Sequence, residues 1–373
     1  MKRIFLLLTV AAALAGCSTD NKSATTESKT PTAGQAKTGI IDAETPESYQ
    51  KSMEKLRGQL TDDRQLYEFV AAVGLLRSGA DSADSFRTMM DGRTVTEVVD
   101  MTRKNGLDNL AASYAKRSKA DDMRKGLIAL AGENNVKHPA RGEVVTIDTE
   151  HLYPSLAAMA LSVDDTTLFR LTAALDVIMA MSLDQLDYSK KIAGRSAAEL
   201  IAAGRADAFE AAVRKSMYTI PANLLRGELD ESPEPENALR FDCSGEAVQS
   251  ASLGRILASL DDTKTLEVMT AINMLRHRCQ DEEKFNSILD KRSARELVNR
   301  MYRENPAEFI QEYGTLRLTY SDTDLAAIRA KYVAFSAVAA NAPAAELQPP
   351  PQPKDAAGKQ PVDNNQKQEQ PAK

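Results

Sequence analysis

The chain has 373 residues and a formal net charge of −6, and 43% of its residues are hydrophobic but only 5% aromatic. The charge is modest and no basic block occurs, which argues against a nucleic-acid-binding protein. Tryptophan is absent and aromatic residues are scarce, which favours helices packed through Ala, Leu and Met over a β-sheet.

Residues 1–17 have the anatomy of a secretory signal peptide. A basic start precedes an apolar run from residue 4 to residue 14, which is too short to span a bilayer as a stable helix. The run ends in Leu14-Ala-Gly-Cys17, which is similar to the lipobox at which bacterial lipoproteins are acylated and cleaved. We predict lipidation of Cys17; the alternative is an ordinary signal peptide in which this cysteine is incidental. Ser18 rather than Asp follows, which favours an outer-membrane lipoprotein facing the periplasm.

The two ends of the mature chain have the composition of disordered segments. Residues 18–44 are rich in Ser, Thr, Lys and Gly, and we expect a disordered tether. Residues 340–373 contain Pro, Gln, Lys and Ala without periodicity, and we expect a disordered tail. The folded part is therefore predicted between these segments.

A fourteen-residue stretch occurs three times without gaps, at residues 86–99, 188–201 and 285–298. An Asp pair precedes each stretch at the same distance, at residues 62–63, 164–165 and 261–262. Apolar residues at three-and-four spacing surround each pair, which predicts helices on both sides. We read the Asp pairs as helix caps, with acid–base or metal carboxylates as the alternative. The predicted fold is all-α, with three tandem helical-bundle repeats of about 100 residues at 45–150, 151–239 and 240–339, the first two including a connector.

Each copy of the stretch contains a capping box, in which a Thr or Ser precedes a Glu by three residues. The hydroxyl then accepts a hydrogen bond from the backbone of the new helix, and the Glu carboxylate accepts one from the cap. The predicted capping residues are Thr94, Glu97, Ser196, Glu199, Ser293 and Glu296. Gly92 and Gly194 suit the left-handed residue that ends the preceding short helix, where the third copy has Lys291.

An arginine precedes each capping residue, at Arg93, Arg195 and Arg292. A cation at a helix N-terminus gains nothing from the dipole of that helix. We expect these side chains to cap the carbonyls of the previous helix or to pair with the repeated Asp residues. The functional alternative is a row of arginines that binds an anionic ligand.

Two cysteines remain after acylation of Cys17, and the periplasm is oxidising. The repeat predicts one helix from residue 244 to 260 and a second, antiparallel helix that ends near Cys279. Because this pairing brings Cys243 close to Cys279, we predict a disulfide between them. The alternative is two independent thiols.

Residues suited to catalysis are few and scattered. The three histidines, His138, His151 and His277, are isolated and lack metal-ligand spacing. No glycine-rich phosphate loop and no calcium loop is present. We therefore expect no catalytic residue, no metal and no cofactor.

The lipobox, the tether and the helical unit that ends in Gly194-Arg-Ser-Ala-Ala-Glu-Leu-Ile201 resemble a family of small uncharacterised proteobacterial lipoproteins, which carry one helical domain of unknown function. The chain is similar to a tandem triplication of that domain over residues 45–335. This resemblance implies a helical envelope lipoprotein and no known activity. We hypothesise a lipid-anchored envelope scaffold or interaction protein without catalytic activity, whose partner is an envelope protein or the cell wall and not a nucleic acid. The alternatives are a periplasmic module that binds a small anionic or cell-wall ligand and, third, an enzyme.

Overall fold

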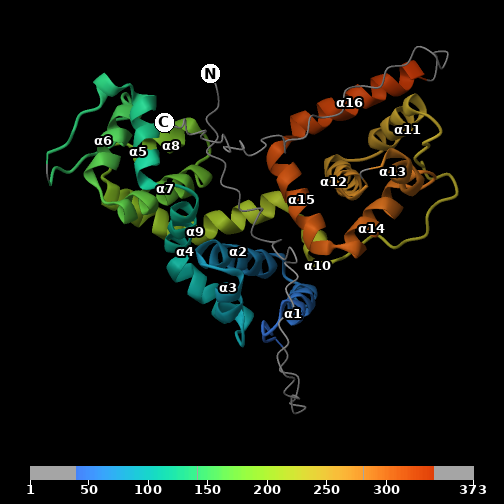
Figure 1. Cartoon of the computed structure of the whole chain (residues 1–373), viewed down its shortest axis with the longest axis horizontal. Coiled ribbons are helices and arrows are strands. Elements are labelled where there is room, and N and C mark those ends of the chain that lie inside the picture. The colour runs from blue at the N-terminus through green and yellow to red at the C-terminus, as the bar shows by residue number, and fades with distance from the viewer. Residues whose placement is uncertain (1–38, 141, 280, 340–373) are drawn as a thin grey trace, which may run out of the picture. The chain divides into compact units, whose positions relative to one another are not determined.

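The computed structural model describes residues 39–140, 142–279 and 281–339 (Figure 1). Within these ranges the regular structure consists of sixteen α-helices and one short 3₁₀ helix, without a β-strand, which confirms the all-α prediction. None of the described helices combines the length and the apolar composition that a membrane span requires. The predicted signal peptide, most of the predicted tether and the tail lie outside the described residues. The prediction of disorder is wrong for residues 39–44, because Ile41 is buried and forms two backbone hydrogen bonds with the turn at Gly92 and Arg93.

The helices group into two compact units. The first unit holds the described residues up to Glu231 together with Asn305–Gly314, and the second holds Ser232–Glu304 with the described residues from Thr315 onward. The first unit contains α1 (Pro46–Gln59), α2 (Asp63–Gly79), α3 (Ala83–Met90), α4 (Val95–Arg117), α5 (Ala120–Ala131), the 3₁₀ helix (Glu133–Asn135), α6 (Leu152–Ser162), α7 (Asp165–Ala180), α8 (Gln185–Ile192), α9 (Ala197–Thr219) and α10 (Ala222–Arg226).

The remaining helices are α11 (Glu246–Ala258), α12 (Asp262–Arg278), α13 (Glu282–Leu289), α14 (Ala294–Glu304), α15 (Pro306–Thr319) and α16 (Asp322–Ala339). The division between the two units falls within α15. We refer to α1–α4 as the first copy, to α6–α9 as the second copy and to α11–α14 as the third copy, because each contains one fourteen-residue stretch and the Asp pair before it.

The first Asp of each pair begins the second helix of its copy. Asp62, Asp164 and Asp261 are the N-caps of α2, α7 and α12. In each case Oδ1 accepts a hydrogen bond from the backbone N–H three residues later, at 2.7, 2.8 and 2.8 Å. The carboxylate also lies at the positive end of the helix dipole, which stabilises the negative charge.

The capping-box residues begin the fourth helix of each copy. The backbone N–H of the Thr or Ser donates to the Glu Oε2 at 2.8 Å in all three copies. The Glu N–H donates back to the hydroxyl at 3.3, 3.4 and 3.0 Å. Hydrogen bonds from the backbone and side chain of Thr94 and Ser196 lower the pKa of Glu97 and Glu199. These contacts are the reciprocal pair that the sequence spacing predicts, and they belong to Thr94–Glu97, Ser196–Glu199 and Ser293–Glu296.

A left-handed residue precedes each of these caps. Gly92 and Gly194 have φ values of 72° and 69°, and Lys291 has a φ of 61°. Lys291 is the only non-glycine residue with positive φ among the described residues. Since a side chain in this conformation costs about 1–2 kcal/mol, the surrounding contacts must hold the third turn in place.

An extended segment before the first helix of each copy holds the turn by two backbone hydrogen bonds. Its central residue donates its N–H to the carbonyl of the arginine before the cap, at 2.8–3.0 Å, and accepts from the left-handed residue at 2.8–2.9 Å. The central residues are Ile41, Ile147 and Phe241, all at most 2% exposed. In the second copy Ile147 joins Met159, Ile178 and Leu200 in one apolar core.

The predicted disulfide between Cys243 and Cys279 is wrong, because both cysteines are free. The prediction required α11 and α12 to lie side by side, whereas α11 packs chiefly against α16, and α12 packs chiefly against α14. Moreover, Cys243 precedes α11 and donates its backbone N–H to Asp290 Oδ1 at 2.9 Å. Cys279 ends α12 and is buried.

Candidate functional site

The three arginines before the capping boxes each lie at their own turn. Arg93 Nε donates to the Met89 carbonyl at 2.6 Å, and Arg292 Nε donates to the Ile288 carbonyl at 2.5 Å. Both contacts close the last turn of the preceding short helix. Arg195 is exposed and makes no equivalent hydrogen bond within the described residues. Anion binding by these arginines stays a prediction.

The second Asp of each pair binds a different arginine, which sequence reasoning missed. We call these residues the closing arginines: Arg124 on α5, Arg226 on α10 and Arg329 on α16. Arg124 Nη1 lies 2.7 Å from Asp165 Oδ1. Arg226 and Arg329 form the equivalent ion pairs with Asp63 and Asp262. The side chains of the closing arginines are only 16%, 12% and 22% exposed.

The closing arginines of the first unit also bind the backbone that precedes each Asp pair. Arg124 Nε donates to the Ala160 carbonyl at 3.1 Å, and its Nη2 donates to the Val163 carbonyl at 3.0 Å. Arg226 makes the same type of contact with the carbonyls of Leu60 and Thr61, at 2.9 and 3.0 Å. Each guanidinium therefore donates hydrogen bonds to backbone carbonyls at the C-terminal end of one helix and forms an ion pair with the Asp at the N-terminal end of the next.

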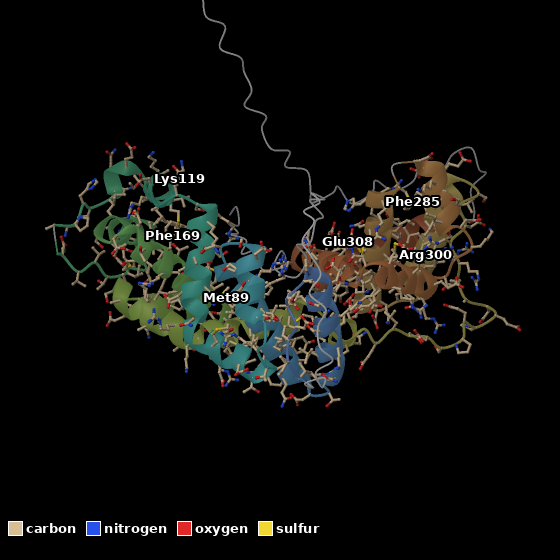
Figure 2. The ribbon with its side chains drawn as sticks, turned by 60° about the horizontal axis from the view of Figure 1, so that its bottom comes forward. Met89, Lys119, Phe169, Phe285, Arg300 and Glu308 are labelled. Atoms are coloured by element: carbon tan, nitrogen blue, oxygen red, sulfur yellow. The ribbon has the colours of Figure 1, made fainter. Side chains whose placement is uncertain are left out.

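Apolar contacts accompany these ion pairs. Figure 2 labels Lys119, at the start of α5, and Phe169 on α7. Phe169 packs against a small core that joins Ala120 of α5 to Ala160 of α6 and Leu168 of α7. Through this core and Arg124, α5 covers the junction of α6 and α7.

A second group of polar residues lies where α4, α7 and α9 meet, and we call Tyr114, Asp176 and Lys215 the polar cluster. The Tyr114 hydroxyl donates a hydrogen bond to Asp176 Oδ2, and Tyr114 is 6% exposed. Burial raises the pKa of Asp176 to about 7, although the charge of Lys215 opposes this shift. Burial lowers the pKa of Lys215 to about 8, opposed by the charge of Asp176. The neighbouring Tyr188 is also buried, and burial raises its pKa to about 12.

Buried ionisable groups with shifted pKa values are typical of functional sites, although ion pairs with a structural role produce the same shifts. The polar cluster contains a carboxyl and an amine that both titrate near neutral pH, the range required for proton transfer. No group of His, Cys, Asp and Glu side chains among the described residues could hold a metal ion. Sequence reasoning missed the cluster because Asp176 lies in the apolar run Ala173–Ile178 and outside the repeated stretch.

Comparison with known proteins bears on the N-terminal region. Residues 1–18 match the prokaryotic membrane lipoprotein lipid attachment site. The match includes Cys17 and supports the assignment of a bacterial lipoprotein anchored to a membrane of the cell envelope. The comparison with curated proteins and the comparison with solved structures each give no match. No family of helical-domain lipoproteins is shown for residues 45–335.

Proposed function

We propose that the protein is a scaffold or interaction protein of the bacterial envelope, anchored by lipid at Cys17 and without catalytic activity. The observation that carries this proposal is the lipid attachment site at residues 1–18. The recurrence of the fourteen-residue stretch and of the Asp pair before it supports the proposal. A lipid anchor at Cys17 keeps the helices close to a membrane surface, where they can hold envelope partners together. Ser18 after the acylated cysteine favours the outer membrane, with the helices in the periplasm.

The three copies are tandem repeats of one helical unit. Four features that recur in each copy support this: the Asp N-cap, the left-handed turn, the capping box and the buried extended segment. A fifth is the ion pair between the second Asp and a closing arginine. Repetition of one unit extends the surface available to partners, as in other repeat proteins.

The polar cluster supports a structural role more than a catalytic one. Its members come from helices of two copies, with Tyr114 on the first and Asp176 and Lys215 on the second. The one hydrogen bond that Asp176 makes within the described residues comes from Tyr114 and joins α4 to α7. The cluster therefore links the two copies to each other.

Proximity labelling in the intact envelope tests the proposed function. A labelling enzyme is fused after Lys373, and the matched control carries the same enzyme directly after residues 1–38. We expect the full chain to enrich a reproducible set of envelope proteins over this lipid-anchored control. An enzyme with a diffusible substrate would give equal labelling by both fusions, and that result would overturn the scaffold proposal.

A second arm separates interaction from catalysis. We expect Lys215→Met, which removes the amine of the polar cluster, to leave the labelled proteins unchanged. A phenotype that follows Lys215→Met while the labelled set and the fold remain intact would indicate chemistry at the cluster.

A further inference from the structure

The first and second copies are related by an approximate two-fold axis. Gly106 and Ala208 stand at the same distance after Thr94 and Ser196, so they are equivalent positions of α4 and α9. A Cβ added to Gly106 would lie 3.5 Å from the Cβ of Ala208. In addition, the fourth helix of each copy packs on the second helix of the other copy: α4 packs on α7, and α9 packs on α2. Contact between equivalent positions is the mark of an isologous pairing.

The two copies also exchange the helix that follows each of them. The α5 helix follows the first copy but packs on α6 and α7 of the second. The α10 helix follows the second copy but packs on α1 and α2 of the first. The closing arginines repeat this exchange, because Arg124 binds Asp165 and Arg226 binds Asp63. This is the arrangement of a domain-swapped dimer, formed here within one chain. We call the first and second copies the exchanged pair.

The third copy is closed by a helix of its own. The α16 helix packs on α11 and α12, and Figure 1 shows it alongside α11. Arg329 of α16 binds Asp262, and Ser336 Oγ donates to the Ala251 carbonyl at 3.0 Å. Hence α16 occupies on the third copy the place that α5 and α10 occupy on the exchanged pair.

The difference between the copies originates in the fourth helix. The α4 and α9 helices each run for 23 residues without interruption and reach across to the other copy. In the third copy α14 ends at Glu304, and α15 begins at Pro306. The break at Asn305 falls at the same distance after Ser293 as Gly106 does after Thr94, which is the point where α4 and α9 cross.

The residues of the break stabilise the start of a new helix. Asn305 Oδ1 accepts from the Glu308 N–H at 3.1 Å, and Asn305 Nδ2 donates to Glu308 Oε2 at 3.0 Å. Pro306 follows at the first helical position, where its missing N–H and fixed φ are favourable. In an uninterrupted helix the same proline would lose a hydrogen bond and clash with the preceding turn.

We propose that the third copy is a self-association site whose partner is the third copy of a second chain, and that the Asn305–Pro306 break is the latch that keeps it closed. When α14 and α15 run on as one helix, α16 is carried away from its own copy and closes the third copy of the other chain. The exchanged pair within the first unit is the structural precedent for this dimer.

The latch is tested by measuring the mass of the purified full chain in detergent by light scattering, after unfolding and refolding at one fixed concentration. The variants are Asn305→Ala/Pro306→Ala and Pro306→Ala, with Pro46→Ala as the matched control at the first position of α1. We expect one chain per particle for wild type and Pro46→Ala and a twofold increase in mass for the double variant. The proposal is overturned if the double variant is as helical as wild type yet monomeric. If the double variant does not fold, the same criterion is applied to Pro306→Ala alone.

Charge reversal identifies the exchanged element. In the double-variant background, one chain carries Arg329→Asp and the other carries Asp262→Arg, and the two are refolded together. Only exchange of α16 between unlike chains restores an opposite-charge pair on both third copies, so heterodimers should exceed the half expected from random pairing. A random distribution would show that the dimer does not form by exchange of α16.

Discussion

Replacement of Asp176 by Asn tests whether this half-buried carboxyl is desolvated beside the buried Tyr114. Asp176 accepts a hydrogen bond from Tyr114, and an amide oxygen at the same place can accept that bond as well. Burial raises the pKa of this carboxyl from 3.8 to about 7. At about 1.4 kcal/mol per pKa unit, the shift corresponds to about 4 kcal/mol as an upper bound on the free energy involved.

The direction of the effect follows from the raised pKa. The folded protein holds the Asp176 proton up to a higher pH than the unfolded chain does, so this residue makes wild type lose stability as the pH rises from about 4 to about 7. The amide that replaces the carboxyl has no proton to lose in this range, and the Asp176→Asn variant therefore escapes this loss. Lys215 has a pKa lowered to about 8 and remains charged on both sides of that window.

The assay is the free energy of urea unfolding of wild type and Asp176→Asn at both ends of the window. We expect the two proteins to agree within about 1 kcal/mol near pH 4, and the variant to be more stable by about 3 kcal/mol near pH 7. Asp100→Asn, at an exposed position of α4, controls for the loss of one carboxylate. If the difference between Asp176→Asn and wild type is the same at both pH values, the carboxyl is not buried with its proton and the reasoning fails.

Three further predictions concern the cap, a closing arginine and the thiols. Ser196→Ala should lower the free energy of unfolding by about 1 kcal/mol in a urea melt. Glu199→Ala should lower it by less, and the effects of the two substitutions should not be additive because both residues belong to one capping box. An unchanged free energy of unfolding for Ser196→Ala would contradict its role as the cap. Arg226→Ala should cost about 2 kcal/mol and speed hydrogen exchange in α10, because it removes charged hydrogen bonds to two carbonyls; unchanged exchange would contradict its role. Alkylation of the unreduced protein in denaturant should count Cys243 and Cys279 as free thiols, and a disulfide-linked peptide would contradict the structure. In the folded protein Cys243 should react slowly, because burial raises its pKa to about 11.

Local signals in the sequence predict local structure well here. The Asp N-caps and the capping boxes each depend on residues three positions apart, so their spacing alone specifies the geometry. The left-handed turns depend in addition on hydrogen bonds to Ile41, Ile147 and Phe241, which are distant in the sequence. Lys291 takes the same backbone conformation as Gly92 and Gly194 because the same two hydrogen bonds surround it. The repeated stretch therefore predicts the helix starts in all three copies.

Contacts between distant segments could not be predicted in this way. The disulfide prediction failed because helices of matching length need not pair, and α11 instead packs on α16. A signal for two closing arginines was present, since Arg124 and Arg226 stand at the same distance after Thr94 and Ser196. Arg329 breaks this register because α15 lies between it and the third capping box. Which Asp each arginine binds depends on the exchange of helices, which no local pattern encodes.

Lipid anchoring at Cys17 is the central claim, and the mass of the N-terminal peptide tests it most directly. The protein is extracted from membranes and digested with trypsin, and the peptide from Cys17 to Lys22 is analysed by mass spectrometry, with a Cys17→Ala variant as control. We expect a mature chain that begins at Cys17 and carries acyl groups on that residue, and we expect Cys17→Ala to lose both the modification and the membrane association. An unmodified Cys17 in a chain cleaved at another position, or a Cys17→Ala variant that remains in the membrane fraction, would contradict the account.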